Sequence, residues 1–307
     1  MRLGVLDIGS NTVHLLIAEI HAGGRPIASV SEKAVLRLMR FLEPDGSISP
    51  TGVDAILTAV TRAREILDDE RPDDLLATAT SAVRDATNGA AVIAEIENRL
   101  GHPLQVLSGS AEAELTFLAA RRWFGWSAGQ LLMFDIGGGS LELACGSEEA
   151  PDVALSLPLG AGRMTIEHLP QDPPGEEAVA RLREHARRLL VPAAAAFAGE
   201  PAPDHVVGSS KTIRSLARLA GNVLTGWAGS DRVTLSRDQL GDWVPRLAKL
   251  PAESRHILPG ITPDRTFQIV AGAVVLHEAM TALGVAELEA SPWALREGVL
   301  LRYIESL

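Results

Sequence analysis

The sequence contains little cysteine, few aromatic residues and no long apolar run. One of its 307 residues is cysteine, and 4% are aromatic. A single cysteine excludes an internal disulfide framework. The longest apolar run, residues 189–198, is about half of the roughly 20 residues that a membrane-spanning helix needs. The N-terminus lacks the apolar region and cleavage site of a signal peptide. We therefore predict a cytoplasmic protein that does not cross a membrane.

Positive charge is also scarce. The chain has 39 acidic residues against 28 lysines and arginines, which gives a formal net charge of −11. Proteins that bind duplex nucleic acid usually carry a broad basic surface, so this balance argues against a nucleic-acid partner. Any polyanionic ligand must be bound by a local patch. The chain is long enough for two domains with cores of their own.

Apolar periodicity predicts alternating groups of strands and helices in both halves of the chain. In the first half we expect strands at 2–8, 12–20, 27–38, 75–80 and 104–107, with helices at 49–67, 88–100 and 110–122. In the second half we expect strands at 130–136, 141–146, 153–159, 205–207 and 286–290, with helices at 175–190, 211–220, 236–249, 265–283 and 293–305. Both halves open with three strands and a helix, which indicates an internal duplication. The glycines and serine of residues 121–130 suggest the boundary.

Two related motifs follow the first strand of each half, LDIGSNTVHLL at residues 6–16 and FDIGGGSLEL at residues 134–143. Glycines in a turn let phosphate oxygens approach the main-chain N–H groups, which a Cβ would obstruct. An aspartate beside bound phosphate needs a cation between the two. Asp7 and Asp135 are therefore predicted magnesium ligands, direct or through water. The alternative is that each aspartate only caps a turn.

Six motifs in chain order resemble the exopolyphosphatase / guanosine pentaphosphate phosphohydrolase (Ppx/GppA) family: DIGSNTVHLL, TATSAVRDATN, SGSAEAELTFLA, DIGGGSLEL, GSSKTIRSLARLAG and SPWALREGVLL. The resemblance spans almost the whole chain and is greatest to the short actinobacterial exopolyphosphatases. It implies an α/β fold of two ribonuclease-H-like domains, as in the actin, sugar kinase and Hsp70 superfamily, with an active-site cleft between them. The expected domains are residues 1–122 with the C-terminal helix 300–307, and residues 123–299.

The same resemblance implies roles for individual residues. Glu112 matches the glutamate that positions or deprotonates the attacking water, and Arg84 matches an arginine that reaches the phosphate. The metal site is implied to be Asp7, Asp135 and Glu142, binding Mg²⁺ or another divalent ion, with a monovalent cation as a further possibility. The implied phosphate-binding residues are Gly9, Ser10, Asn11, Gly137, Gly138, Gly139, Ser140, Gly208, Ser209 and Ser210.

The activity implied is hydrolysis of terminal phosphate from inorganic polyphosphate by a homodimer. Hydrolysis of the 5'-phosphate of pppGpp is the alternative within the family. An actin-fold kinase and a non-catalytic phosphate sensor are less favoured alternatives. The sequence departs from the family in three ways. Phe267 stands where relatives often carry an acid, at the edge of the implied cleft. Ala111 stands where the first of two adjacent glutamates is common, so that position is not essential here. Long members carry a further C-terminal module, whereas this sequence ends at Leu307, which suggests shorter polyphosphate substrates.

Two further groups of residues have more than one interpretation. GSSKT at 208–212 is not a phosphate-binding P-loop, because Ser210 stands where that motif requires glycine. Lys211 and Arg214 either direct positive charge at phosphate or lie on an ordinary helix surface. We expect Trp123, Phe124 and Trp126 to pack where the two domains join, with ligand stacking as the alternative.

Overall fold

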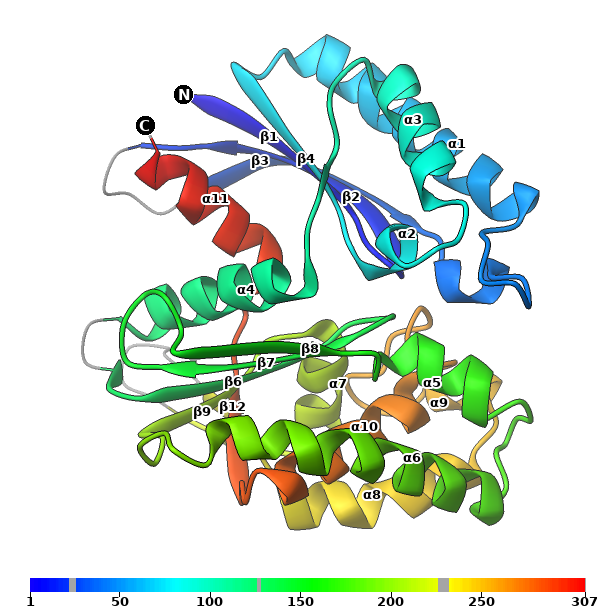
Figure 1. Cartoon of the computed structure of the whole chain (residues 1–307), viewed down its shortest axis with the longest axis vertical. Coiled ribbons are helices and arrows are strands. Elements are labelled where there is room, and N and C mark those ends of the chain that lie inside the picture. Colours follow the sequence, from blue (N-terminus) through cyan, green and yellow to red (C-terminus); the bar gives the residue numbers. More distant parts are fainter. Residues whose placement is uncertain (22–25, 126–127, 226–231, 307) are drawn as a thin grey trace. The chain divides into compact units, whose positions relative to one another are not determined.

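The computed structural model describes residues 1–21, 26–125, 128–225 and 232–306 (Figure 1). The chain divides into two compact units, Met1–Ala111 with Val299–Leu307, and Glu112–Gly298. Each unit contains one mixed β-sheet with helices packed on it. The domain limits predicted from the sequence, 1–122 with 300–307 and 123–299, stay a prediction.

The first unit is built on a five-stranded sheet with the order β3-β2-β1-β4-β5. Strand β1 is antiparallel to β2 and parallel to β4. Helices α1 and α3 lie side by side on one face of this sheet (Figure 1). The elements are β1 (Arg2–Ile8), β2 (Thr12–Glu19), β3 (Ile27–Val35), η1 (Leu38–Phe41), α1 (Pro50–Glu70), β4 (Asp74–Ala79), α2 (Ser81–Arg84), α3 (Gly89–Leu100) and β5 (Gln105–Val106).

Local signals set the helix limits in this unit. Ser49 accepts a hydrogen bond from the N–H of Gly52, and Pro50 occupies the first helical position, so α1 begins where the sequence predicts. Gly101 ends α3 in the left-handed conformation, with φ at 68°. The short helices η1 and α2 were not predicted, because four residues are too few to show a helical period.

The second unit has a seven-stranded sheet with the order β10-β11-β12-β9-β6-β7-β8. The apolar helix α10 lies at the centre of its larger core, against α5, α6, α7 and α8. No described helix is both long and apolar enough to cross a membrane. The strands are β6 (Leu131–Ile136), β7 (Leu141–Gly146), β8 (Val153–Leu157), β9 (His205–Gly208), β10 (Asn222–Leu224), β11 (Arg232–Ser236) and β12 (Glu287–Ala290). The helices are α4 (Gly109–Phe124), α5 (Ala161–His168), α6 (Glu176–Ala194), η3 (Ala195–Phe197), α7 (Lys211–Ala220), α8 (Arg237–Lys249), α9 (Ala252–Arg255), α10 (Ile269–Ala282) and α11 (Leu295–Glu305), of which α4 begins in the first unit and α11 ends in it.

Five strands of each sheet share one topology, in agreement with the predicted duplication, and β10 and β11 extend the second sheet. In each unit an antiparallel three-stranded meander, β1-β2-β3 or β6-β7-β8, is followed by a strand parallel to its first member, β4 or β9. A further parallel strand, β5 or β12, comes next in the sheet. Helix α5 and strands β10 and β11 were not predicted. Glycines at 160 and 162 obscure the start of α5, and both strands are short.

Alternation along β6 decides where its aspartate points. Leu132, Phe134 and Ile136 belong to the core around α10, whereas Leu131 and Met133 belong to the smaller core under α4. Successive side chains of a strand point to opposite faces, so Asp135 lies on the α4 face. Helix α4, which carries Glu112, packs on this same face of the sheet.

Candidate active site

The first predicted phosphate loop joins β1 to β2 in the first unit. Its carbonyl groups face the protein, since Ser10 and Asn11 accept hydrogen bonds from the N–H groups of residues 36–38. Within the described residues, the N–H groups of Ser10 and Asn11 have no hydrogen-bond acceptor. A Cβ on Gly9 would lie 3.4 Å from the Thr12 carbonyl oxygen, an ordinary contact. The fold itself tolerates a side chain at Gly9, so the glycine is better explained by the approach of a ligand.

Arg84 is the last residue of the short helix α2. The loop between β1 and β2 contacts the start of this helix. The hydroxyl groups of Ser10 and Ser81 lie 2.9 Å apart, and Ser81 is the first residue of α2. The Arg84 side chain donates to the carbonyl oxygen of Leu107 over 2.9 Å and to Asp85 over 3.0 Å. Arg84 is therefore anchored beside the residues that lead into α4. Ser81 is a residue that sequence reasoning missed.

The second predicted loop, residues 137–140, joins β6 to β7 in the second unit. Its three glycine carbonyl groups are held by the start of α5. The N–H of Ala161 donates to Gly137 over 3.0 Å, and that of Arg163 donates to Gly138 over 2.9 Å. The Arg163 side chain donates to Gly139, also over 2.9 Å. In the described part of the chain, the N–H groups of Gly138, Gly139 and Ser140 have no acceptor, and they are available to an anion.

Gly160 allows this arrangement because α5 begins in direct contact with the loop. A Cβ on Gly160 would lie 2.3 Å from the Gly139 carbonyl carbon and 2.3 Å from the Ser140 nitrogen. No real Cβ approaches backbone atoms so closely. Sequence reasoning missed Gly160, Ala161 and Arg163, although the glycines directly after the third strand were a visible signal. By contrast, a Cβ on Gly137 would meet nothing closer than 3.5 Å.

Three acidic residues of the second unit share one electrostatic environment. Asp135 and Glu142 face each other across β6 and β7, and Glu112 lies in the first turn of α4. Burial raises the pKa of Glu142 well above its usual range, and the negative charges of Glu112 and Asp135 raise it further. The hydroxyl group of Ser156, which donates to Glu142 over 2.9 Å, acts in the opposite direction. Glu112 and Glu142 are both buried.

Asp135 is also held by the third predicted loop, residues 208–210, which follows β9. The Ser209 hydroxyl donates to the Asp135 carboxylate over 2.5 Å. Burial raises the pKa of Asp135 to about 6, and this hydrogen bond together with the positive charges of Arg214 and Arg265 limits the rise. Gly208 and Ser210 have structural partners. A Cβ on Gly208 would meet Ile213 at 2.4 Å, and Ser210 caps α7.

The donor set at Asp135 and Glu142 fits a divalent cation. No group of three or more His, Cys, Asp or Glu side chains that could hold a metal occurs among the described residues. Burial raises the pKa of both Asp135 and Glu142, and the charges of Glu112 and Asp135 raise that of Glu142 further, so a bound cation would stabilise the ionised pair. Mg²⁺ is commonly held by one or two carboxylates, with water and phosphate oxygens completing its coordination.

The remaining predicted residues have plainer surroundings. Lys211 forms an ion pair with Asp264, at 2.8 Å, and Arg214 donates to the Pro292 carbonyl oxygen over 2.7 Å. Trp123 contacts Trp293. Trp126 lies outside the described residues.

Comparison with known proteins shows which family the chain resembles. The model of the Ppx/GppA phosphatase family matches residues 16–307. Exopolyphosphatase 1 of Mycobacterium tuberculosis is 45% identical over 306 residues, which cover 100% of this chain and 89% of that protein. The guanosine-5'-triphosphate,3'-diphosphate pyrophosphatase of Aeromonas hydrophila is 27% identical over 310 residues, or 96% of this chain and 58% of that protein.

A solved structure agrees along the full length. The crystal structure of an exopolyphosphatase from Cytophaga hutchinsonii superimposes with a TM-score of 0.87 at 26% identity, and the match covers 100% of this chain and 99% of that one. The predicted α/β fold with two ribonuclease-H-like domains is thereby confirmed.

Proposed function

Because the chain belongs to the Ppx/GppA phosphatase family, we propose that it is an exopolyphosphatase that removes terminal phosphate from inorganic polyphosphate. One observation carries this proposal. A buried glutamate, Glu112, shares its environment with the paired carboxylates of Asp135 and Glu142, on one face of β6 and β7. Beside them is a loop whose three N–H groups have no acceptor among the described residues.

These groups match the needs of phosphoanhydride hydrolysis, which requires a positioned water and charge stabilisation on the transferred phosphoryl group. We assign Glu112 as the residue that positions the attacking water, and its carboxylate accepts a proton from that water. The N–H groups of Gly138, Gly139 and Ser140 donate to phosphoryl oxygens. Arg84 supplies positive charge from the first unit. We assign phosphate binding also to Gly9, Ser10 and Asn11, and to the loop of Gly208, Ser209 and Ser210.

Mg²⁺ fits the carboxylate set, and when bound it would neutralise phosphate charge. We propose Asp135 and Glu142 as its ligands in the second unit and Asp7 as the acidic residue of the equivalent loop in the first. Asp135 and Asp7 occupy matching positions, each one residue before the end of the first strand of its meander. We also propose a homodimer, on the family resemblance, which light scattering of the purified chain tests.

The proposed function is tested by phosphate release from tripolyphosphate, long-chain polyphosphate and pppGpp, using one enzyme preparation with Mg²⁺. We expect turnover of the inorganic substrates to exceed that of pppGpp. The Aeromonas relative, by its name, acts on a guanosine polyphosphate, so pppGpp hydrolysis is the second candidate. Faster release from pppGpp would reverse the order, and absence of release from all three would reject the hydrolase.

Replacing Asp135 by asparagine should make the metal-free protein more stable at neutral pH. The pKa of Asp135 is raised to about 6 in the folded chain. The unfolded chain therefore ionises first as the pH rises, and the wild type loses stability between about pH 4 and pH 6. Asparagine keeps an acceptor for Ser209 but has no charge. In EDTA, the variant should match the wild type near pH 4 and exceed its free energy of unfolding by about 2–3 kcal/mol at pH 7.5.

Urea unfolding followed by circular dichroism measures this difference. Addition of Mg²⁺ at pH 7.5 should stabilise the wild type and leave Asp135→Asn unchanged. A variant that is less stable than the wild type at pH 7.5 without metal would contradict the electrostatic account. Equal stabilisation of both proteins by Mg²⁺ would remove Asp135 from the metal site.

Replacing Arg84 by alanine should lower kcat and raise KM together. The guanidinium group is held at Leu107 and Asp85, and its positive charge is proposed to contact phosphate both before and during reaction. Loss of this charged hydrogen bond raises KM, and kcat falls as well because the bond is stronger in the transition state; together they correspond to a decrease of about ten- to a hundredfold in kcat/KM. Arg62→Ala, which removes an exposed arginine of α1, is the matched control. Unchanged kinetics in Arg84→Ala would exclude it from the site.

A further inference from the structure

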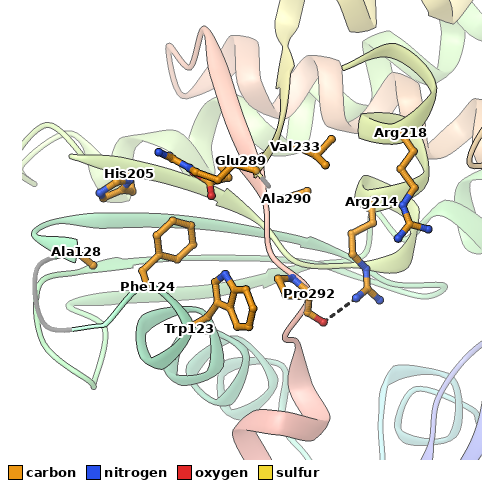
Figure 2. A pocket seen from close by; sticks show the side chains of 11 residues that line it. Trp123, Phe124, Ala128, His205, Arg214, Arg218, Val233, Glu289, Ala290 and Pro292 are labelled. Carbon is orange, nitrogen blue, oxygen red and sulfur yellow. Dashed lines mark hydrogen bonds and ion pairs between the residues drawn. The ribbon is translucent and has the colours of Figure 1, made fainter. Parts of the chain in front are cut away.

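A cavity of about 590 Å³ lies in the second unit and includes none of the proposed catalytic residues. Figure 2 shows the rings of Trp123 and Phe124 reaching into it from α4, and Arg214 and Arg218 approaching it from α7. The cavity is thus flanked by aromatic rings in one part and guanidinium groups in another. Its residues are Trp123, Phe124, Ala128, His205, Arg214, Arg218, Arg232, Val233, Glu289, Ala290 and Pro292.

The aromatic rings are held in place by partners. The Trp123 ring centroid lies 5.6 Å from that of Trp293, with the planes tilted by 56°. Phe124 contacts the ring of His205 at 5.2 Å. Trp123 nevertheless leaves 36% of its surface exposed. Rings fixed in this way offer a flat apolar surface for a planar ligand at little cost in side-chain entropy.

The guanidinium groups of the cavity differ in their partners: Arg214 donates to the Pro292 carbonyl oxygen over 2.7 Å, whereas Arg218 has no such bond among the described residues. Arg218 is exposed, and within the described residues it has no hydrogen-bond or ion-pair partner. Burial lowers the pKa of Arg214, and the positive charge of Arg218 lowers it further, whereas Asp135 and Glu297 oppose this. Arg232, by contrast, is paired with Glu289. Two neighbouring cations that repel each other form a site for an anion.

We propose that this cavity binds a purine nucleotide, with its base against Trp123 and Phe124 and its phosphates on Arg214 and Arg218. A bare phosphate chain would leave the aromatic rings unused, and a neutral aromatic compound would leave the charge of Arg218 without a partner among the described residues. The volume is within the range of small-ligand sites. This goes beyond the proposed activity, because the cavity is separate from the phosphate loops.

The same helix connects the cavity to the catalytic loop. Helix α7 begins directly after Ser209, which donates to Asp135, and Arg214 of α7 interacts electrostatically with Asp135. A phosphate bound to Arg214 would neutralise part of the positive charge that acts on Asp135.

Isothermal titration calorimetry of the full chain in EDTA tests the proposal with three probes, ADP, adenosine and pyrophosphate. We expect ADP to bind at least about tenfold more tightly than either part alone, since both halves of the cavity contribute. Arg218→Ala and Trp123→Leu should each weaken ADP binding about tenfold or more. Arg181→Ala, which removes an exposed arginine of α6, should bind ADP as the wild type does.

Each other outcome overturns the proposal. Pyrophosphate binding as tight as ADP binding would identify a site for phosphate alone. Equal ADP binding by all variants would place the nucleotide elsewhere, including the catalytic loops. Trp123→Leu could fail to fold. Arg218 is exposed and lies outside the catalytic loops, so we expect Arg218→Ala to fold and to test the proposal by itself. Phosphate release from tripolyphosphate by Arg218→Ala, measured in parallel without nucleotide, tests the proposed function separately.

Discussion

Replacement of Glu112 by glutamine is expected to lower kcat for polyphosphate hydrolysis by about a thousandfold and to leave substrate binding intact. Glutamine has nearly the same shape as glutamate but cannot accept the proton of the attacking water, and a general base contributes about 10²- to 10⁴-fold. The Glu112 side chain is buried in the first turn of α4. Its replacement by glutamine also removes a negative charge that raises the pKa of Glu142.

Steady-state phosphate release measures the rate, and equilibrium binding of tripolyphosphate to Glu112→Gln measures affinity. Glu114→Gln is the matched control, because Glu114 is an exposed residue of the same helix two positions away. Undiminished hydrolysis by Glu112→Gln would reject the role of Glu112. A parallel loss of binding would assign Glu112 to substrate contact instead of to the water.

Replacement of Gly160 by alanine should reduce activity by at least about a hundredfold. The new Cβ would come within 2.3–2.4 Å of backbone atoms of Gly139 and Ser140, and backbone cannot rotate out of the way as a side chain can. The loop at 137–140 must therefore move, and its N–H groups lose the positions that make them effective donors to phosphoryl oxygens. Such overpacking also costs about 1–3 kcal/mol of stability.

The structure contains a well-matched control for this substitution. Gly175 caps α6 as Gly160 caps α5, with similar backbone angles, but a Cβ at Gly175 would meet nothing within 4 Å. Gly175→Ala should therefore retain wild-type activity and stability. Full activity in a folded Gly160→Ala protein would show that the position of the loop is not critical. Thermal unfolding distinguishes displacement of the loop from global loss of structure.

The sequence was informative about elements with strong local signals. The strands on either side of each DIG motif, helix α1 with its Ser49-Pro50 start and helix α3 with its Gly101 end follow from periodicity and capping. The repeated order of these elements indicated the duplication. Helix α2 has too few residues to show a period, and glycines at 160 and 162 obscure the start of α5, so both were missed. Yet α2 and α5 are the helices that hold Arg84 and the second phosphate loop.

Some candidate site residues could be identified from local sequence motifs, whereas the residues that hold them in place could not. Motif spacing identified Asp135, Glu142 and the glycine loop, because their residue types must stand at fixed positions after a strand. The partners that hold them come from distant parts of the chain. Ser209 lies 74 residues from Asp135, and Arg163 lies 24 residues from Gly139. No local pattern in one sequence reports such pairs.

The sequence by itself determined the two related α/β halves, the family and the acidic and glycine-rich motifs, because these depend on the order and chemistry of neighbouring residues. Only the tertiary structure decided that Gly160 must lack a side chain, that Asp135 and Glu142 have raised pKa values, and that Trp123 and Arg218 line one cavity. These properties depend on distance and burial, which arise when segments far apart in the chain pack together.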